Sequence, residues 1–68
     1  MLESRIKGLI ELSKYNRQQI MKIMKVSETT LSNWSTGKSI PSLEKAYKLS
    51  RLLGVTVEEL YHYTDEDE

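Results

Sequence analysis

Two of the helices that the hydrophobic pattern predicts are joined by a very short connection. The first follows Asn16, whose side chain is a good N-cap, and its apolar stripe ends near Met24. The second begins after the next cap, Ser27, and ends at Gly37, a residue suited to the left-handed conformation that closes many helices. Helices joined this tightly have to cross steeply. The second helix is therefore expected to press one side against the first and to present its other side to solvent.

The rest of the pattern predicts an all-α fold, a compact five-helix bundle. Apolar residues recur at helical spacing, and no segment alternates with the period of a strand, so we expect no sheet. Ser42 caps a fourth helix that ends at Gly54, and Thr56 with Glu59 forms a capping box for a short fifth. The five helices are expected at about residues 2–14, 16–24, 28–36, 43–53 and 57–61. Residues 1–64 then form one domain, followed by an acidic, frayed tail at 65–68.

The first four predicted helices each have an apolar side that we expect to face one common core. These sides comprise Ile6, Leu9, Ile10, Leu12, Ile20, Ile23, Met24, Leu31, Trp34, Leu43, Ala46, Tyr47, Leu49, Leu52 and Leu53, with Val26 from the short connection. The chain contains no cysteine, so this core has to hold without disulfides or thiolate-bound metal.

The predicted helix at 28–36 combines an apolar back with a short polar front. Leu31 and Trp34 lie three residues apart and are expected to anchor it in the core, although an indole can also stack on a base. The other side is polar throughout and carries Glu28, Thr29, Ser32, Asn33 and Thr36. The major groove of duplex DNA is about 12 Å wide and accepts a helix of this kind. The pattern therefore favours a helix that reads DNA.

Charge is distributed unevenly along a chain whose formal net charge is zero. All ten basic residues lie between Arg5 and Arg51, a span that holds three acidic residues and so has a balance of +7. From Glu58 onward there are six acidic residues and no basic one. For a polyanionic partner the local field matters more than the total, so a basic body with an acidic end is compatible with DNA binding.

A series of short motifs resembles one known family. The motifs are Asn16-Arg17-Gln18-Gln19-Ile20-Met21, Val26-Ser27, Leu31-Ser32-Asn33-Trp34, Gly37-Lys38, Pro41-Ser42 and Leu53-Gly54-Val55-Thr56-Val57-Glu58-Glu59-Leu60. In order and spacing they resemble the Cro and lambda-repressor family of helix-turn-helix proteins, also called XRE-type regulators, over about residues 4–62. The resemblance implies a five-helix bundle that binds double-stranded DNA, commonly as a homodimer on a two-fold operator.

The chain departs from the family pattern at several positions. Arg17 stands where the family usually has a phosphate-contacting Gln, and Met21 stands where a small residue lets the two helices approach. Lys25 occupies a turn position that is often Gly. An Arg–Glu pair that many members form corresponds here to Ile10 and Ser35, so both charges are missing together. Replacing a buried ion pair with apolar packing is often neutral or stabilising.

The candidate DNA contacts fall into two groups. For base reading we expect first Asn33 and Thr29, then Glu28 and Ser32, because a carboxamide pairs with adenine and a methyl group packs on thymine. Glu28 has an alternative as a favourable charge in the first helical turn, and Asn33 and Thr29 have one as solvated polar residues. Contacts to phosphates are expected from Asn16, Arg17, Gln18, Thr30, Lys38 and Ser39.

Two further expectations concern partners. Leu60, Tyr61 and Tyr63 form a candidate dimer surface, with scattered surface aromatics as the alternative. His62 is the single histidine, so we expect no metal site, no cofactor, no small-molecule ligand and no enzyme activity. No apolar run approaches the roughly 20 residues of a membrane span, and the N-terminus lacks a signal peptide, so a cytoplasmic protein without a membrane partner is expected.

Together these observations favour a sequence-specific transcriptional regulator, a repressor that binds a palindromic operator as a homodimer. The alternative is an antitoxin-like interaction module that neutralises a protein partner through its helical surface and acidic end. The two can coexist, since a module of this kind can also bind DNA.

Overall fold

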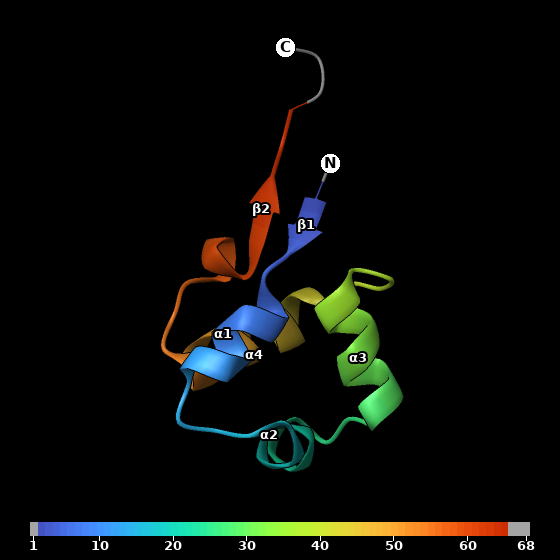
Figure 1. Cartoon of the computed structure of the whole chain (residues 1–68), viewed down its shortest axis with the longest axis vertical. Helices are drawn as coiled ribbons and strands as arrows, with labels where there is room; N and C mark the ends of the chain where they lie inside the picture. Colours follow the sequence, from blue (N-terminus) through green and yellow to red (C-terminus); the bar gives the residue numbers. More distant parts are fainter. Residues whose placement is uncertain (1, 66–68) are drawn as a thin grey trace.

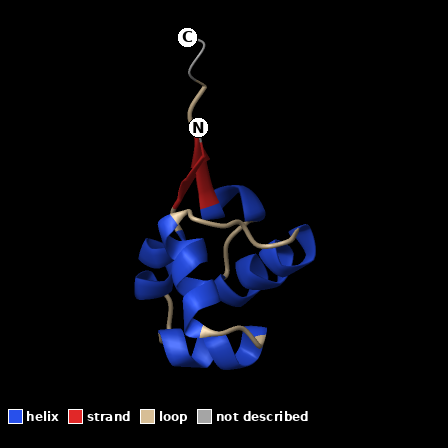
Figure 2. Cartoon of the chain, turned by 90° about the vertical axis from the view of Figure 1, so that its right-hand side faces the viewer, coloured by secondary structure: helices blue, strands red, loops and turns tan. Residues whose placement is uncertain are grey.

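The computed structural model describes residues 2–65. In chain order they form β1 (Leu2–Ser4), α1 (Ile6–Leu12), α2 (Arg17–Met24), α3 (Glu28–Thr36), α4 (Leu43–Leu53), the 3-10 helix η1 (Val57–Leu60) and β2 (Tyr61–Tyr63). The molecule measures 40 × 22 × 21 Å, and the two strands lie at one end of the long axis, above the helices (Figures 1 and 2). None of the described helices is long and apolar enough to cross a membrane.

Polar caps set where most of the helices begin, as the sequence predicts. The side-chain oxygens of Asn16, Ser27, Ser42 and Thr56 each accept a hydrogen bond of 2.8–3.3 Å from the backbone N–H three residues further on. The helices at Asn16 and Thr56 have complete capping boxes. Gly37 and Gly54 close α3 and α4 with positive φ angles of 85° and 75°. These caps satisfy backbone groups that a helix end leaves without partners.

One apolar core joins the helices to the base of the sheet. The buried apolar residues are Ile6, Ile10, Ile20, Met24, Leu31, Trp34, Ala46, Leu49 and Leu60. All of them except Leu60 lie on the sides that the sequence predicts to be inward. Leu9, Val26, Leu52 and Leu53 pack around them as partly buried residues.

Four residues expected in the core are instead exposed. Leu12 is 86% exposed because α1 ends there, and Ser13 turns the chain away by bonding back to the carbonyl of Ile10. Leu43 and Tyr47 lie one turn apart on an uncovered side of α4 and are 70% and 56% exposed. Ile23 is 39% exposed. Helical spacing thus identified the apolar residues without showing how far neighbouring elements cover them.

The expectation of no sheet and five α-helices is wrong. Residues 2–4 do not extend the first helix but pair with β2 in an antiparallel sheet, with Leu2 opposite Tyr63 and Ser4 opposite Tyr61. The hydrogen bond from Arg5 N–H to the Leu60 carbonyl, 2.9 Å, continues this pairing to the first residue before α1. The expected fifth helix is one 3-10 turn, because the chain becomes extended at Tyr61. Four α-helices and one 3-10 helix are therefore present within residues 2–65.

Candidate nucleic-acid interface

The turn between α2 and α3 is closed by one residue in a left-handed conformation. Lys25 has φ 58° and ψ 47°, and the N–H of Val26 donates back to the carbonyl of Met21 at 3.0 Å. Ser27 then begins α3 by accepting a hydrogen bond from Thr30 N–H at 3.1 Å. The chain changes direction within Lys25, Val26 and Ser27. Figure 1 shows α2 nearly end-on and α3 along its length, so the two helices cross steeply, as the short connection predicts.

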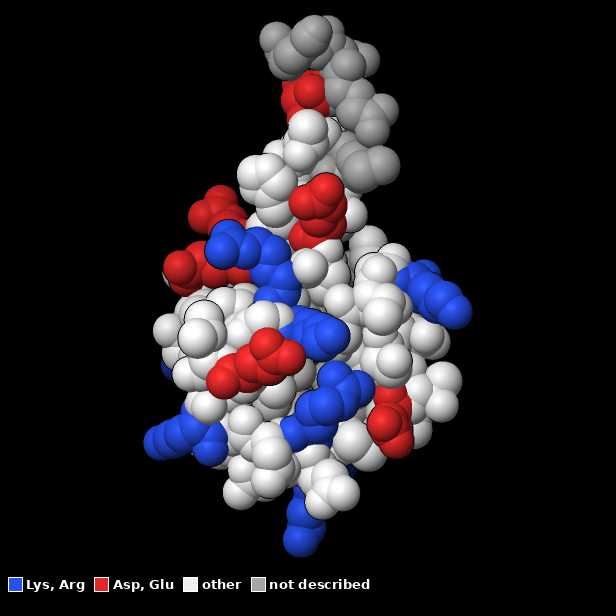
Figure 3. Space-filling view, in the orientation of Figure 1, with Lys and Arg blue, Asp and Glu red and all other residues white. Residues whose placement is uncertain are grey.

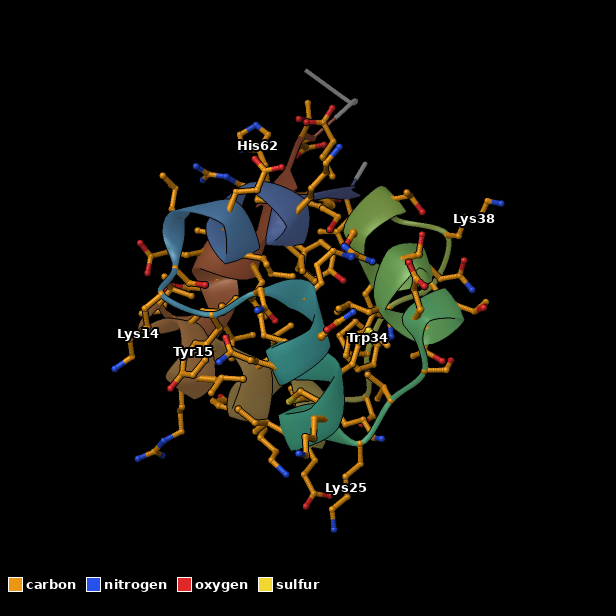
Figure 4. All side chains as sticks on the ribbon, turned by 60° about the horizontal axis from the view of Figure 1, so that its bottom comes forward. Lys14, Tyr15, Lys25, Trp34, Lys38 and His62 are labelled. Atoms are coloured by element: carbon orange, nitrogen blue, oxygen red, sulfur yellow. The ribbon has the colours of Figure 1, made fainter. Side chains whose placement is uncertain are left out.

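The inner side of α3 is fixed by packing and by one hydrogen bond. Leu31 is fully buried and Trp34 is 4% exposed, so both act as the predicted anchors. Trp34 lies between α2 and α3 (Figure 4), and its carbonyl accepts a hydrogen bond of 2.7 Å from the hydroxyl of Ser4 in β1. The orientation of α3 about its own axis is therefore held from both sides. This anchoring determines which side chains face outward.

The outer side of α3 presents polar groups that the fold does not use. Glu28 and Thr29 are exposed, and Ser32 and Asn33 are partly exposed. Within residues 2–65 the side chains of Thr29, Ser32 and Asn33 make no hydrogen bond, so their donors and acceptors are available to a ligand. Thr36 differs, because its hydroxyl donates to the carbonyl of Ser32 at 3.0 Å.

At the N-terminus of α2, the predicted contacts lie beside α3. Asn16 uses its Oδ1 atom to accept from Gln19 N–H, which leaves its amide N–H groups for a ligand. Arg17 is partly buried, and its Nη1 atom lies 3.5 Å from the hydroxyl of Ser35, to which it donates. Gln18 is exposed. The guanidinium of Arg17 therefore connects the start of α2 with the last turn of α3.

The C-terminal end of α3 carries the second cationic position. Lys38 and Ser39 are exposed, and the N–H of Ser39 donates to the carbonyl of Asn33 at 3.3 Å, which holds the turn after Gly37. Figure 4 shows Lys38 pointing away from the body of the molecule, and it has no ion-pair partner among the described residues. Thr30 lies at the other end of α3, where its oxygen accepts from the Ser27 hydroxyl at 3.1 Å and its own O–H stays available.

Ser35 is a residue of this surface whose role the sequence does not reveal. Its hydroxyl donates to the carbonyl of Leu31 at 2.9 Å while its oxygen accepts from Arg17. The sequence places Ser35 where related chains carry an acidic partner, but the arginine that reaches it comes from α2, while Ile10 of α1 is buried in the core. No spacing rule connects positions 17 and 35, so only the fold could show this contact.

The candidate dimer surface needs a correction. Leu60 is fully buried in the core and cannot contribute to a surface. Tyr61 is partly buried and packs against the core, and Tyr63 is 68% exposed. The expectation grouped these residues as one surface patch, whereas Leu60 ends η1 and the two tyrosines lie in β2. Because side chains alternate along a strand, Tyr61 and Tyr63 share one face of the sheet.

Basic side chains lie at many separate places on the helical body. Figure 3 shows lysines and arginines spread over it, whereas acidic side chains become more frequent toward the end that carries the strands. Within residues 2–65 no group of His, Cys, Asp and Glu side chains could hold a metal ion. The predicted tail beyond residue 65 lies outside the described residues.

Comparison with known proteins gives two matches. Residues 6–60 match a family model described as Helix-turn-helix. The chain is also 27% identical over 66 residues to an uncharacterized HTH-type transcriptional regulator of Methanocaldococcus jannaschii, MJ0272, and the alignment covers 97% of this chain and 100% of that protein. No solved structure matches the chain significantly.

Proposed function

Because this chain belongs to the helix-turn-helix family, we propose that it is a sequence-specific DNA-binding transcriptional regulator, a repressor that binds a palindromic operator as a homodimer. One observation carries the proposal. The outer side of α3 offers Thr29, Ser32 and Asn33 without internal hydrogen-bond partners among residues 2–65. Arg17 reaches Ser35 in the last turn of α3, and Lys38 follows the end of that helix. An exposed polar helix with cationic side chains beside it suits a major groove that lies between two phosphate backbones.

Base reading is assigned to the outer side of α3. The carboxamide of Asn33 can pair with N6 and N7 of adenine, and the methyl group of Thr29 can pack on the methyl group of thymine. Ser32 can donate or accept with either base of a pair, and Glu28 can accept from N4 of cytosine. Side chains this short require α3 to lie deep in the groove. Its buried anchors Leu31 and Trp34 leave the outer side clear for such an approach.

Phosphate contacts are assigned to the N-terminus of α2 and to residues at both ends of α3. The first backbone N–H groups of α2 attract an anion, and Asn16, Arg17 and Gln18 add side-chain donors at the same place. Lys38, Ser39 and the hydroxyl of Thr30 would serve phosphates elsewhere along the groove. These contacts provide affinity and register, while α3 provides discrimination between sequences.

The proposed mechanism of regulation is occupancy. Two copies bound to adjacent half-sites would cover a promoter and exclude polymerase. A two-fold protein matches a two-fold DNA site, with its half-sites about one helical turn, or 34–36 Å, apart.

Selection from random duplex DNA tests this function directly. We expect one enriched site made of two inverted half-sites about one helical turn apart. Arg17→Ala serves as a control variant, because it should weaken binding to all sequences while leaving the selected site unchanged. A protein that enriches no sequence and shows no association with duplex DNA at low salt would refute the proposal.

A further inference from the structure

The hydroxyl of Ser35 has a fixed direction because its proton is already in use. It donates to the carbonyl of Leu31 at 2.9 Å, one turn earlier in α3. A serine hydroxyl has one proton to donate and two lone pairs that accept. Toward any other group the oxygen of Ser35 can therefore act only as an acceptor. Arg17 of α2 supplies that group, with its Nη1 atom 3.5 Å from the oxygen.

Arg17 keeps most of its hydrogen-bonding capacity after this contact. A guanidinium carries five N–H donors in one plane. Within residues 2–65 the bond to Ser35 is the one hydrogen bond that the side chain makes, and no acidic side chain there forms an ion pair with it. The contact therefore restrains the guanidinium and leaves its remaining donors and its full positive charge for a ligand.

A neutral acceptor has an advantage over a charged one at this position. An acidic side chain would hold the guanidinium more strongly, but it would also cancel the charge that attracts a phosphate. The hydroxyl of Ser35 holds the group without cancelling its charge. A long side chain loses conformational freedom when it binds a ligand. A side chain that is already restrained before binding loses less, so its contact with the ligand is stronger.

The restrained guanidinium belongs to the same helix end as two free backbone donors. The cap at Asn16 uses the N–H groups of Gln19 and Ile20. The N–H groups of Arg17 and Gln18 have no acceptor within residues 2–65. From this end of α2 the Arg17 side chain reaches the last turn of α3. A phosphate at the start of α2 would thus meet backbone donors together with a side chain that is held against α3.

We propose that Ser35 is a positioning residue for DNA binding. Its oxygen holds the guanidinium of Arg17 before DNA arrives, so that the remaining donors of the guanidinium meet a backbone phosphate. Ser35 touches no DNA in this assignment and acts through Arg17 alone. The assignment rests on the proposed function. It connects the phosphate contact of α2 to the helix that reads the bases, so that the two keep one fixed relation.

A double-mutant cycle tests whether Ser35 acts through Arg17. Ser35→Ala removes the acceptor, and we expect it to weaken binding of one selected duplex by about fivefold per bound copy. In a protein that already carries Arg17→Ala, adding Ser35→Ala should change binding by less than about twofold. Titration of the duplex gives the four dissociation constants. Equal weakening in both backgrounds, or no weakening in the wild-type background, would overturn the proposal.

Two further variants separate this contact from a general effect on α3. Ser35→Thr keeps a hydroxyl that can bond to the carbonyl four residues back, so it should bind the duplex more tightly than Ser35→Ala does. Thr36 makes the same kind of bond, to the Ser32 carbonyl at 3.0 Å, but holds no cation within residues 2–65. Thr36→Ala should therefore bind like the wild type. If Thr36→Ala weakens binding as much as Ser35→Ala, or if Ser35→Thr restores nothing, the proposal is wrong.

The free protein provides a test that needs no DNA. NMR relaxation of the Nε–H group of Arg17 reports how freely its side chain moves on the picosecond to nanosecond timescale. We expect Ser35→Ala to lower the order parameter of this group and Thr36→Ala to leave it unchanged. Circular dichroism and urea denaturation check that both variants stay folded. An order parameter that Ser35→Ala does not lower would overturn the proposal.

The two proposals can fail separately. If the wild type and Ser35→Ala bind a selected duplex equally well, the role of Ser35 is overturned and the DNA-binding function stays intact. If the wild type binds no duplex at low salt, the proposed function is refuted, and the mobility of Arg17 in Ser35→Ala still decides whether Ser35 holds the guanidinium.

Discussion

At the scale of single residues, Asn33 has the clearest chemical role in the proposed interface. Its carboxamide has no hydrogen-bond partner within residues 2–65, so binding a base requires no internal bond to break. We expect Asn33→Ala to relax the sequence preference at one base pair and to cost about 1–3 kcal/mol on the preferred site. Repeated selection and duplex titration measure the two effects.

Thr36→Ala is the matched control for this variant. Thr36 is also exposed on α3, but its hydroxyl is already bonded to the Ser32 carbonyl. Thr36→Ala should therefore leave the selected DNA site unchanged. If Asn33→Ala selects the same site with the same stringency as the wild type, the base-reading assignment is wrong.

Tyr61 carries a polar atom that the fold leaves without a partner. Its hydroxyl is buried and has no hydrogen-bond partner within residues 2–65, which is costly because the hydroxyl gives up its bonds to water and nothing there replaces them. Tyr61→Phe removes that hydroxyl and keeps the ring that packs on the core. We expect the free energy of unfolding to rise by about 1 kcal/mol, measured by urea denaturation at neutral pH. A clear decrease in stability would show that the hydroxyl has a partner in solution.

The same residue predicts how stability changes in alkaline solution. Burial raises the pKa of Tyr61 above its ordinary value of 10.0. Below that value the Tyr61 hydroxyl is neutral in both the folded and the unfolded chain, so its ionisation does not affect stability. As the pH rises toward and through the higher pKa of the folded state, the unfolded chain forms tyrosinate more readily, and the free energy of unfolding of the wild type falls. The stability difference between Tyr61→Phe and the wild type should therefore widen above about pH 10. Denaturation series at increasing pH measure this difference, and a constant difference would contradict the prediction.

At the scale of elements, the connection between α2 and α3 holds some strain. Lys25 is the only non-glycine residue with positive φ among residues 2–65. A side chain in this conformation costs roughly 1 kcal/mol, which glycine avoids at the expense of a more flexible unfolded chain. We expect Lys25→Gly to raise the free energy of unfolding by up to about 1 kcal/mol. Lys22→Gly, inside α2, should instead lower it by a similar amount. Thermal unfolding of both variants measures these changes. A lower free energy of unfolding for Lys25→Gly than for the wild type would show that the conformation of Lys25 is not strained.

The elements that sequence predicts well are those specified by local chemistry. Asn16, Ser27, Ser42 and Thr56 each act within three residues of their own position, so their caps can be recognised without knowing the fold. The same holds for the outer side of α3, because Leu31 and Trp34 fix its orientation through helical spacing alone. The role of each outward side chain on DNA stays a prediction.

The elements that sequence misses depend on contacts distant along the chain. Leu2 pairs with Tyr63 from the other end of the described residues, and each strand has three residues, too few for an alternating pattern to show. The contact between Arg17 and Ser35 is likewise invisible until α2 and α3 are placed together. Tyr47 shows the converse error, since an apolar residue at core spacing remains exposed where no element covers α4.

At the scale of the whole molecule, opposite charges occupy different parts of the protein. The span from Arg5 to Arg51 contains all ten basic residues, while the chain from Glu58 onward is acidic. DNA that approaches the helices is attracted, and DNA that approaches the strand end is repelled. The acidic end would therefore lower the affinity for DNA bound in wrong orientations.

Salt dependence tests whether particular cations, rather than the general field, hold the DNA. Removing one side chain that binds a phosphate should reduce the slope of log K against log salt by about 0.9. We expect this reduction per bound copy for Lys38→Ala, whose side chain points outward beside α3. Lys14 lies on the opposite side of the molecule in Figure 4, 5.7 Å from the ring centre of Tyr15, so Lys14→Ala should lower affinity slightly and leave the slope unchanged. Titrations of one selected duplex at several salt concentrations give both slopes. A direct phosphate contact releases a bound counterion, whereas a distant charge does not. Equal slopes of log K against log salt for the two variants would therefore mean that Lys38 acts only through the electrostatic field of the protein.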